Sequence, residues 1–512
     1  MRPLRECRAR RGLHRPGRGA AVANRTAVAA RAAQGAQKAG RRRVNRTLVE
    51  GGLVFTGEEV LAGATVVIDG ERVARVIPSR SVDGSGRPGD GPRLPGDGGG
   101  RRGEGGCLPR DGDSVVHASG RLVTPGLVNA HTHIYSALAR GIHLKDPAPG
   151  NFREILERLW WRLDRALGPE EIRLSALLHG IESLRSGVTT IFDHHSSQRS
   201  IRGSLATISG ALDEIGLRAA LCFEVSDREG SDAARDGIEE NLSFARDLLA
   251  QSAPLRAAHF GLHASFTLSD RALKLCRESL AGTVGEGVLG FHIHLAEDGI
   301  DQALTRERHR QSVVERLKQW EILGPRSLCV HGVHLEERER EILAGSGTWL
   351  VHCPESNMNN AVGAVRLSDM REAGVRLALG SDGFTANITR ECLTAHLLQS
   401  HIRSDPRAGY LEVPSLLHGE NAALAAGVFG EGVGKIVEGG PADLVLWDYL
   451  PPTPLDRTNL YGHLLFGLVD ARASSVWIAG RCVLRHGRVV GVDEDEVIRG
   501  CEKGARQLWE RL

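Results

Sequence analysis

Short apolar runs alternate with longer amphipathic stretches through the centre of the chain, from about residue 124 to residue 430. Apolar runs bounded by turn residues predict buried strands, and apolar positions three and four residues apart predict helices. The amphipathic stretches cover residues 152–167, 170–185, 238–250, 302–320 and 391–402. The strand candidates end near His133, His195, Glu224, His263, Glu297, His331, His352 and Asp382. Eight strands with associated helices predict an α/β fold of the (β/α)8 TIM-type barrel.

Short strands punctuated by glycine occur near both ends of the chain. The candidates lie at residues 47–54, 64–70, 73–77 and 114–117, and again at 442–448, 475–480 and 482–490. The economical arrangement is a small β-sandwich domain built from residues 44–123 and 431–495, with the barrel of residues 124–430 inserted into it. A C-terminal helix is expected over residues 496–512. Residues 83–113, dominated by Gly, Pro, Arg and Asp, predict a flexible surface insertion.

Charge is distributed unevenly along the 512-residue chain, whose net charge is only +2. Residues 1–43 carry thirteen Arg or Lys and one acid, Glu6, so this segment holds +12 and leaves −10 on the remainder. Its Arg/Ala/Gly-rich composition predicts a disordered basic tail. Three explanations stay open for the tail: an upstream start site without function, an arm for nucleic acid or a membrane surface, and a targeting peptide. The acidic body gives no reason to expect nucleic-acid binding there.

Cysteine usage and hydropathy favour a cytoplasmic protein. The nine cysteines are scattered and form no C-x-x-C pair. Neither a disulfide framework nor a cysteine zinc site is therefore expected, and a reducing compartment fits best. No apolar stretch approaches the roughly 20 residues that a membrane-spanning helix needs, so no membrane partner is expected.

Histidines and carboxylates gather at several of the predicted strand ends. His131 and His133 form an H-x-H pair, and both imidazoles point to one side because side chains alternate along a strand. A lone strand-end histidine is more often a packed residue than a ligand, but the spacing over successive strands favours one shared metal site. The contributing stretches are residues 131–133, 292–297, 331 and 381–383. Imidazoles and carboxylates suit a zinc-like ion that acidifies a bound water, which indicates a hydrolase.

Five motifs give the chain a closer resemblance. They are residues 125–133 (PGLVNAHTH), 294–297 (HLAE), 330–335 (VHGVHL), 353–357 (CPESN) and 380–383 (GSDG). With them, residues 45 to about 500 resemble the amidohydrolase superfamily, in the branch of chlorohydrolases, guanine deaminase and related aminohydrolases. Within that branch the chain is most similar to the SsnA aminohydrolases. The stretches that carry this narrower resemblance are residues 134–137, 159–164, 192–195 and 356–363.

The resemblance implies a role for each matching residue. The implied metal ligands are His131, His133, His294 and Asp382. Asp382 would also take a proton from the attacking water, and Glu297 would shuttle it. His331 would hold the hydroxide or the developing oxyanion, and His263 would contact the substrate. Two-metal members of the superfamily carry a lysine on the fourth strand, and residues 257–264 have none. One divalent ion is therefore expected, zinc by default, with iron or manganese also acceptable.

The predicted activity is deamination of an amino-substituted heterocycle, purine-like or pyrimidine-like. The metal-bound hydroxide would add to the C–NH₂ carbon, and ammonia would leave. The alternatives are hydrolysis of another C–N or C–Cl bond, as in a chlorohydrolase or a cyclic amidohydrolase, and a non-catalytic barrel scaffold. The expected partner is a small heterocyclic substrate. Many members of the superfamily are dimers, so the resemblance also allows a homodimer, although no residue pattern marks an interface.

The sequence allows two interpretations for four other residues near the predicted site. His194 and His195 close the second strand, where a role in packing and a role beside the pocket are equally compatible with the sequence. Trp160 and Trp161 lie in a helical stretch. One of them is expected to pack in the core, and the other is a candidate to cap the substrate cleft.

Overall fold

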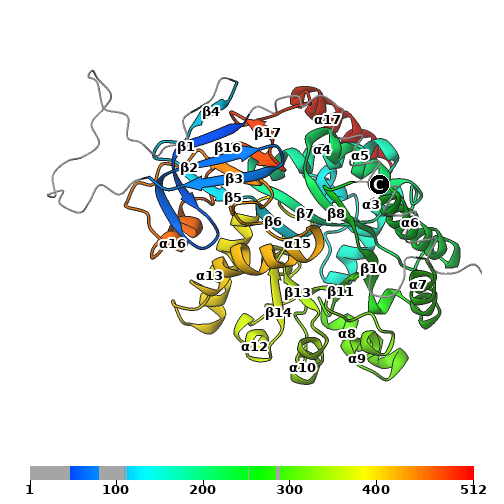
Figure 1. Ribbon diagram of the computed structural model, residues 1–512. Coiled ribbons are helices and arrows are strands. Elements are labelled where there is room, and N and C mark those ends of the chain that lie inside the picture. Colours follow the sequence, from blue (N-terminus) through cyan, green and yellow to red (C-terminus); the bar gives the residue numbers. More distant parts are fainter. Residues whose placement is uncertain (1–45, 80–108, 110–111, 252, 284–288) are drawn as a thin grey trace, which may run out of the picture. The chain divides into compact units, whose positions relative to one another are not determined.

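Strands from the two ends of the chain pair into one nine-stranded sheet (Figure 1). The structure is a computed structural model that describes residues 46–79, 109, 112–251, 253–283 and 289–512. The order is β18-β17-β16-β15-β5-β1-β2-β3, and β4 also pairs with β1. These strands are β1 (Thr47–Phe55), β2 (Val60–Asp69), β3 (Arg72–Ile77), β4 (Ser114–His117), β5 (Leu122–Pro125), β15 (Leu444–Trp447), β16 (Ala473–Ile478), β17 (Arg481–Arg485) and β18 (Arg488–Val489).

The predicted β-sandwich is not confirmed, because both faces of this single sheet are covered in different ways. Side chains alternate along β15: Leu444 and Leu446 pack in one small core with residues of the same sheet. Val445 and Trp447 point the opposite way, into the large core shared with the α/β part of the chain. One face of this sheet therefore packs on residues of the same sheet, and the other face packs on the α/β part.

Parallel strands form the centre of the α/β part. One sheet has the order β6 (Leu127–Thr132), β7 (Val188–His195), β8 (Arg218–Phe223) and β9 (Arg256–Ala258). The other has the order β10 (Phe260–Ala264), β11 (Phe291–Leu295), β12 (Leu328–His331), β13 (Trp349–His352) and β14 (Arg376–Leu379). Single parallel bridges, Thr132–Asp382 and Val225–Leu262, join the two sheets at both junctions. The predicted α/β class is thus confirmed, with two bridged sheets in place of one continuous eight-stranded ladder.

Helices surround these parallel sheets (Figure 1). None of those in the described ranges is long and apolar enough to cross a membrane. They are η1 (Ile134–Ala139), α2 (Phe152–Ile155), η2 (Leu156–Trp160), α3 (Trp161–Ala166), α4 (Pro169–Arg185), α5 (Ser204–Ile215), α6 (Ser231–Ala250), η3 (Ser265–Thr267), α7 (Asp270–Thr283), α8 (Gly299–His309), α9 (Val313–Gln319), α10 (Glu337–Ser346), α11 (Pro354–Asn359), α12 (Leu367–Glu372), α13 (Ile388–Arg403), α14 (Glu412–Ser415), η4 (Leu416–Glu420), α15 (Asn421–Phe429), α16 (Leu460–Phe466) and α17 (Glu494–Glu510).

Capping residues explain where the helices differ from the expected ranges. The stretch 302–320 is divided between two helices: it contains most of α8 and all of α9. The first helix ends because Arg310 adopts a left-handed φ of 58°. Ser312 then begins the second with a capping box to Glu315. The C-terminal helix α17 starts at residue 494, two residues earlier than expected, because the Asp493 side chain accepts from two backbone amides of its first turn. The tail of residues 1–43 and most of the 83–113 insertion lie outside the described residues.

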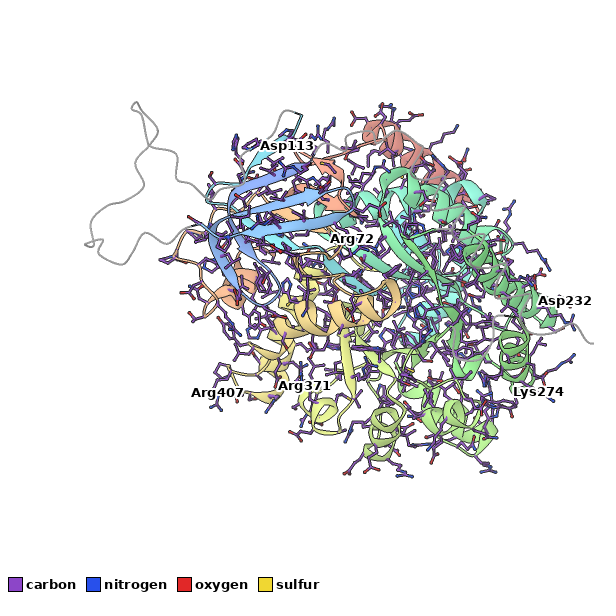
Figure 2. The ribbon with its side chains drawn as sticks, viewed as in Figure 1. Arg72, Asp113, Asp232, Lys274, Arg371 and Arg407 are labelled. Carbon is purple, nitrogen blue, oxygen red and sulfur yellow. The ribbon has the colours of Figure 1, made fainter. Side chains whose placement is uncertain are left out.

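A buried ion pair connects the nine-stranded sheet to the α/β part. Most labelled charges, such as Asp232 and Arg407, point outward (Figure 2). Arg218 on β8 and Asp443, just before β15, are by contrast 3% and 0% exposed. Their side chains pair, with one contact between Arg218 Nη2 and Asp443 Oδ1 at 3.2 Å. The same Oδ1 accepts from the backbone amide of Ala479 at 2.7 Å.

Replacing Asp443 by alanine is expected to lower the free energy of unfolding by about 3–5 kcal/mol, because it leaves the Arg218 guanidinium buried without its counter-charge. Urea denaturation monitored by circular dichroism measures the change. Asp232→Ala is the control, since Asp232 pairs with Arg235 at the surface, where an ion pair contributes little. Equal stability of the two variants would show that the buried pair does not hold the two parts together.

Candidate metal centre and active site

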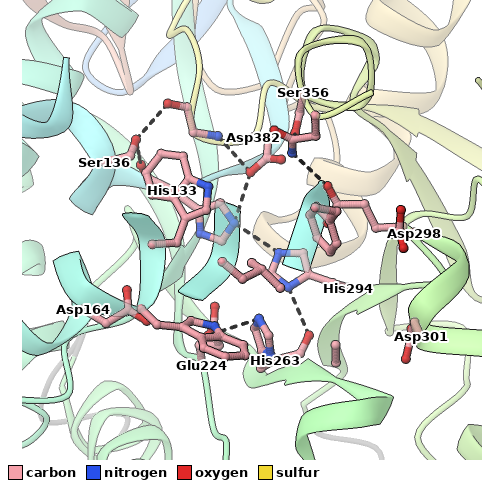
Figure 3. A pocket seen from close by; sticks show the side chains of 18 of the residues that line it. His133, Ser136, Asp164, Glu224, His263, His294, Asp298, Asp301, Ser356 and Asp382 are labelled. Carbon is pink, nitrogen blue, oxygen red and sulfur yellow. Dashed lines mark hydrogen bonds and ion pairs between the residues drawn. The ribbon is translucent and has the colours of Figure 1, made fainter. Parts of the chain in front are cut away.

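Three imidazoles and a carboxylate meet where parallel strands end. His131 lies on β6 and His133 just beyond it, so strand alternation directs both side chains to one side. His294 comes from β11, and a nitrogen of each of the three histidines lies within 4.8 Å of the others. Asp382 follows β14, and its Oδ1 lies 3.7 Å from His131 Nε2 and 3.2 Å from His133 Nε2. Figure 3 shows the last of these contacts.

Backbone carbonyls fix how the imidazoles face the centre. His133 Nδ1 donates to the carbonyl of His194 at 2.6 Å, and His294 Nδ1 donates to the carbonyl of His263 at 3.0 Å. In a neutral imidazole the other nitrogen then presents a lone pair. The two Nε2 atoms nevertheless lie only 3.1 Å apart, beside a carboxylate oxygen. Acceptors that converge in this way fit a cation between them, and carbonyl-bound imidazoles are typical of metal ligands.

The third imidazole is oriented by another histidine. His131 Nδ1 is hydrogen bonded to His292 Nε2 at 2.9 Å, and His292 Nδ1 in turn lies 3.7 Å from the sulfur of Cys222. The Nε2 of His131 is fully buried and has no hydrogen-bond partner among the described residues. A buried nitrogen without a partner costs stability unless something binds it, so this atom also fits a metal ligand.

The close approach of these groups shifts the pKa values of Asp382 and His133. Burial alone would raise the pKa of Asp382, but its contacts with His131 and His133 hold that pKa well below the usual value. Burial alone would lower the pKa of His133, but Asp382 outweighs it and raises that pKa to about 9. A negative carboxylate thus attracts positive charge to this point, whether as a proton or as an ion.

A second group adjoins the first and shares Asp382. His331, at the end of β12, places its Nε2 3.4 Å from Glu297 Oε2 and 3.8 Å from Asp382 Oδ2. Asn360 donates to Glu297 Oε1 at 3.1 Å. Burial, and then the charge of Asp382, raises the pKa of Glu297 well above that of a free glutamate. Glu297 therefore holds a proton more readily than a free glutamate does, which is the property of a proton shuttle.

Three residues of the site adopt left-handed backbone conformations without being glycine. Ala296, His331 and Asp382 have φ values of 45°, 75° and 55°. Such conformations cost energy for residues with a Cβ and cluster at functional sites, where the surrounding structure enforces them. Here backbone hydrogen bonds between strand ends enforce two of them, since His133 N donates to the carbonyl of Asp382 and His334 N donates to that of Ala296.

A pocket of about 710 Å³, including its open mouth, lies over these groups. Six aromatic side chains contribute to its walls: Tyr135, Phe152, Trp160, Trp161, Phe266 and Phe384. Both tryptophans line it, and Trp160 also packs against the large hydrophobic core, as expected for one of the two. They come from a helix that passes through the π-helical turn η2, an irregularity often found at functional sites. Flat aromatic walls over polar groups suit a planar heterocycle.

The structure also places the remaining histidines. His263 lines the pocket, with its Nδ1 2.6 Å from Thr267 Oγ1. His194 is buried beside the cluster and supports His133 through its carbonyl. His195 is buried, bonded through Nε2 to Ser197 Oγ at 2.9 Å, and is not among the pocket-lining residues.

Three charged residues at this pocket have no role in the predictions made from the sequence: Asp164, Glu224 and Arg228. Asp164 and Glu224 line the pocket, and Arg228 bonds to both. Glu224 could have been identified from the sequence, because it lies at the end of a predicted strand in the same way as His131 and His263. Asp164 lies on an amphipathic helix and Arg228 in a loop, where charged residues usually face solvent, so their sequence context gave no signal.

Together the fold and the site define a metal-dependent hydrolase of the parallel α/β type. The chain belongs to the amidohydrolase family, whose sequence profile matches residues 122–483. It is 33% identical, over 78% of its length and 90% of the relative's, to a 5-methylthioadenosine/S-adenosylhomocysteine deaminase of Desulforudis audaxviator. It is 29% identical, over 76% and 86%, to a 5'-deoxyadenosine deaminase of Methanopyrus kandleri. The predicted superfamily is confirmed, and the narrower resemblance to SsnA stays a prediction.

Solved structures share the fold. An adenosine deaminase from Xanthomonas campestris with bound zinc superposes with a TM-score of 0.74 at 23% identity, over 91% of this chain and 99% of that one. The zinc complex of an atrazine chlorohydrolase from Arthrobacter aurescens gives a TM-score of 0.68 at 18% identity, over 90% and 100%. At these identities the likeness shows a common fold, and it does not distinguish between a deaminase and a chlorohydrolase.

Proposed function

We propose that this protein is a metal-dependent aminohydrolase that removes the amino group of a heterocycle as ammonia. The observation that carries the proposal is the pair of adjoining groups that share Asp382, one built to hold a cation and one built to move a proton. The curated relatives named as deaminases of adenosine derivatives support the same reaction class. The aromatic pocket above the two groups supports a flat, ring-shaped substrate.

His131, His133, His294 and Asp382 would hold the metal ion, because their acceptor atoms converge without a donor between them. A divalent ion bound there lowers the pKa of a water to near neutrality and so supplies the nucleophile. The described residues that line the pocket include no lysine that could bridge a second ion, which supports a single ion. Zinc is the proposed metal, as in the related solved structures, and iron or manganese would suit the same ligands.

The remaining steps use side chains of the chain itself. Asp382 accepts the proton that the attacking water loses, since its low pKa keeps it ionised. Glu297 gives its proton to the ring nitrogen as the C–O bond forms, and it regains a proton when Asp382 passes on the one taken from the water. When the C–N bond breaks, Glu297 gives this proton to the departing amine, and the hydroxyl group on the same carbon returns its own proton to Glu297 as it becomes the carbonyl. His331 stabilises negative charge as a hydrogen-bond donor: Asn357 Nδ2 donates to its Nδ1 at 2.9 Å, which leaves the ring proton on Nε2, directed at Glu297 and Asp382. His263 would contact the bound ring.

Several structural assignments accompany this proposal. Residues 124–430 would form the catalytic domain with its parallel strands closed as a (β/α)8 barrel, which the two bridges between the sheets support. Residues 44–123 and 431–495 would form the small β domain, and residues 496–512 the C-terminal helix. We also propose a cytoplasmic location, on the grounds of the cysteine usage, and a homodimer, which the resemblance to the superfamily allows.

Ammonia release from the zinc-loaded protein tests the proposed function. The panel comprises aminopurines, aminopyrimidines, pterins and a chlorotriazine, each also analysed for the released anion. Ammonia from at least one amino-heterocycle, with incorporation of one oxygen atom from water, is the expected result. Release of chloride without ammonia would instead identify a chlorohydrolase, and silence across the panel from a protein with one ion bound would favour a non-catalytic role.

A further inference from the structure

One wall of the pocket consists of hydrogen-bond acceptors. We call Asp164, Glu224 and His263 the acceptor wall. Asp164 and Glu224 are 1% and 3% exposed, and His263 is 6% exposed, yet all three line the pocket. Figure 3 shows them on the side of His133 and His294 that lies away from Asp382 and Ser356. The proposed mechanism uses the opposite side, and it gives the two carboxylates no task.

Arg228 holds the two carboxylates from outside the pocket. Its Nη1 donates to Glu224 Oε1 at 3.1 Å, and its Nη2 donates to Asp164 Oδ2. The indole of Trp161 covers the guanidinium, whose central carbon lies 5.3 Å from the ring centroid. Arg228 is not among the residues that line the pocket, although both of its partners are. A single cation therefore fixes the positions of both carboxylates beside the pocket.

The free acceptor atoms of the wall lack donors. Asp164 Oδ1 is buried and has no hydrogen-bond partner among the described residues. The Nδ1 of His194 lies 3.5 Å from Glu224 Oε2. Burial raises the pKa of Asp164 to about 7, partly opposed by Arg228.

The tautomer of His263 adds a third acceptor. The hydroxyl of Thr267 donates to the carbonyl of Ala264 at 3.1 Å, so its oxygen can only accept from His263 Nδ1. The proton of a neutral His263 then lies on Nδ1, and Nε2 carries a lone pair. This Nε2 lies 3.8 Å from Glu224 Oε1. Two acceptor atoms at that distance cannot hydrogen bond to each other. A donor group of a ligand beside them would satisfy both.

The wall lies close enough to the metal cluster to contact the reacting ring itself. A carboxylate oxygen of Glu224 is within 4.8 Å of ring nitrogens of both His263 and His294. A heterocycle whose amino carbon lies at the cluster spans about this distance with its own atoms. A donor that satisfies the wall is therefore carried by the ring, because a group attached beyond the ring would lie farther from the cluster.

We propose that the acceptor wall selects amino-heterocycles that carry unsubstituted ring N–H groups on the edge away from the departing amine, such as free nucleobases. This inference rests on the proposed function for the orientation of the ring. Ribosides and ring N-methylated bases lack one of these donors, and they are rejected because they leave a buried carboxylate oxygen unpaired. A pocket built around hydrogen bonds discriminates strongly against an analogue that cannot make them.

Isothermal titration calorimetry on zinc-loaded Glu297→Gln protein tests the wall without turnover. The ligands are adenine, guanine and cytosine, each compared with its ring N-methylated derivative and its riboside. At least one free base should bind about 10- to 100-fold more tightly than both analogues, the factor expected for a hydrogen bond to a charged group. Adding Asp164→Asn or Glu224→Gln should remove this preference. Adding Glu157→Gln should preserve it, since Glu157 lies on the same helical segment and pairs with Arg153 at the surface.

The comparison of ligands within one protein separates recognition from folding, because a merely destabilised variant loses affinity for base and analogue alike. Equal binding of free base and analogue, tighter binding of the riboside, binding by none of the bases, or a preference that survives both wall substitutions would each overturn the inference. Ammonia release by the wild-type protein from methylated and free bases at the same rate would overturn it and leave the proposed function intact. Selective binding without any ammonia release would overturn the proposed function alone.

Discussion

Replacing Glu297 by glutamine is expected to lower kcat for ammonia release by about 10²- to 10⁴-fold, the usual contribution of a positioned general acid or base. The amide has nearly the same shape as the carboxyl group, so it can keep the hydrogen bond with Asn360, but it cannot carry the proton to the leaving amine. Burial raises the pKa of Glu297, which favours the acid form that donates the proton. Steady-state kinetics with the substrate found in the panel measure the effect.

The metal content distinguishes this outcome from loss of the site. The Glu297→Gln protein should retain one ion per chain, because Glu297 belongs to the group around His331 and not to the three converging histidines. Glu341→Gln, which alters a surface pair with Arg338, is the control for a glutamate far from the chemistry. If the Glu297→Gln protein kept wild-type kcat, Glu297 would not be the proton shuttle.

Replacing His133 by alanine is expected to abolish ammonia release and to lower zinc affinity by more than about 100-fold. Removing a residue that only hydrogen bonds to a metal ligand already lowers metal affinity about 10- to 100-fold, and here a proposed ligand itself is removed. The effect should be large because His133 Nε2 lies close to both His294 Nε2 and Asp382 Oδ1, so its removal opens the centre of the site. Elemental analysis after dialysis against a chelator, followed by zinc titration, measures the change.

His195→Ala is the matched control for this experiment. His195 is buried like His133 and is the last residue of β7, but its Nε2 bonds to Ser197 and it does not line the pocket. This control protein should keep its ion. Wild-type zinc affinity in the His133→Ala protein would rule out His133 as a ligand, whereas loss of zinc from both variants would point to a general collapse of the fold.

The candidate site was largely predictable because its residues follow strands. Strand alternation gave His131 and His133 a common direction, and the carboxyl ends of parallel strands meet at one end of the fold. His294 and Asp382 lie at that same end, which is why spacing alone could group them. The structure brings these side chains together as expected, and their roles as metal ligands stay predictions until an ion is measured.

The nine-stranded sheet shows what strand patterns leave open. The periodicity of β15 predicts a strand with two faces, but it does not say what covers each face. Leu444 and Leu446 pack within the small core, while Val445 and Trp447 meet the α/β part, where Trp447 lies against Gly187. The same apolar pattern is compatible with a β-sandwich. What covers each face of the strand depends on packing between residues far apart in the chain.

By itself the sequence determined the α/β class, the family and the cluster of residues proposed to hold the ion, because strand periodicity and short motifs are local properties. Only the tertiary structure decided the acceptor wall: Asp164 on a helix over the pocket and Arg228 in a loop are 64 residues apart and meet only when those elements pack. Both residues look like ordinary surface charges in the sequence. Burial places Asp164 in the wall of the pocket and Arg228 behind it, and burial is a property of the folded chain as a whole.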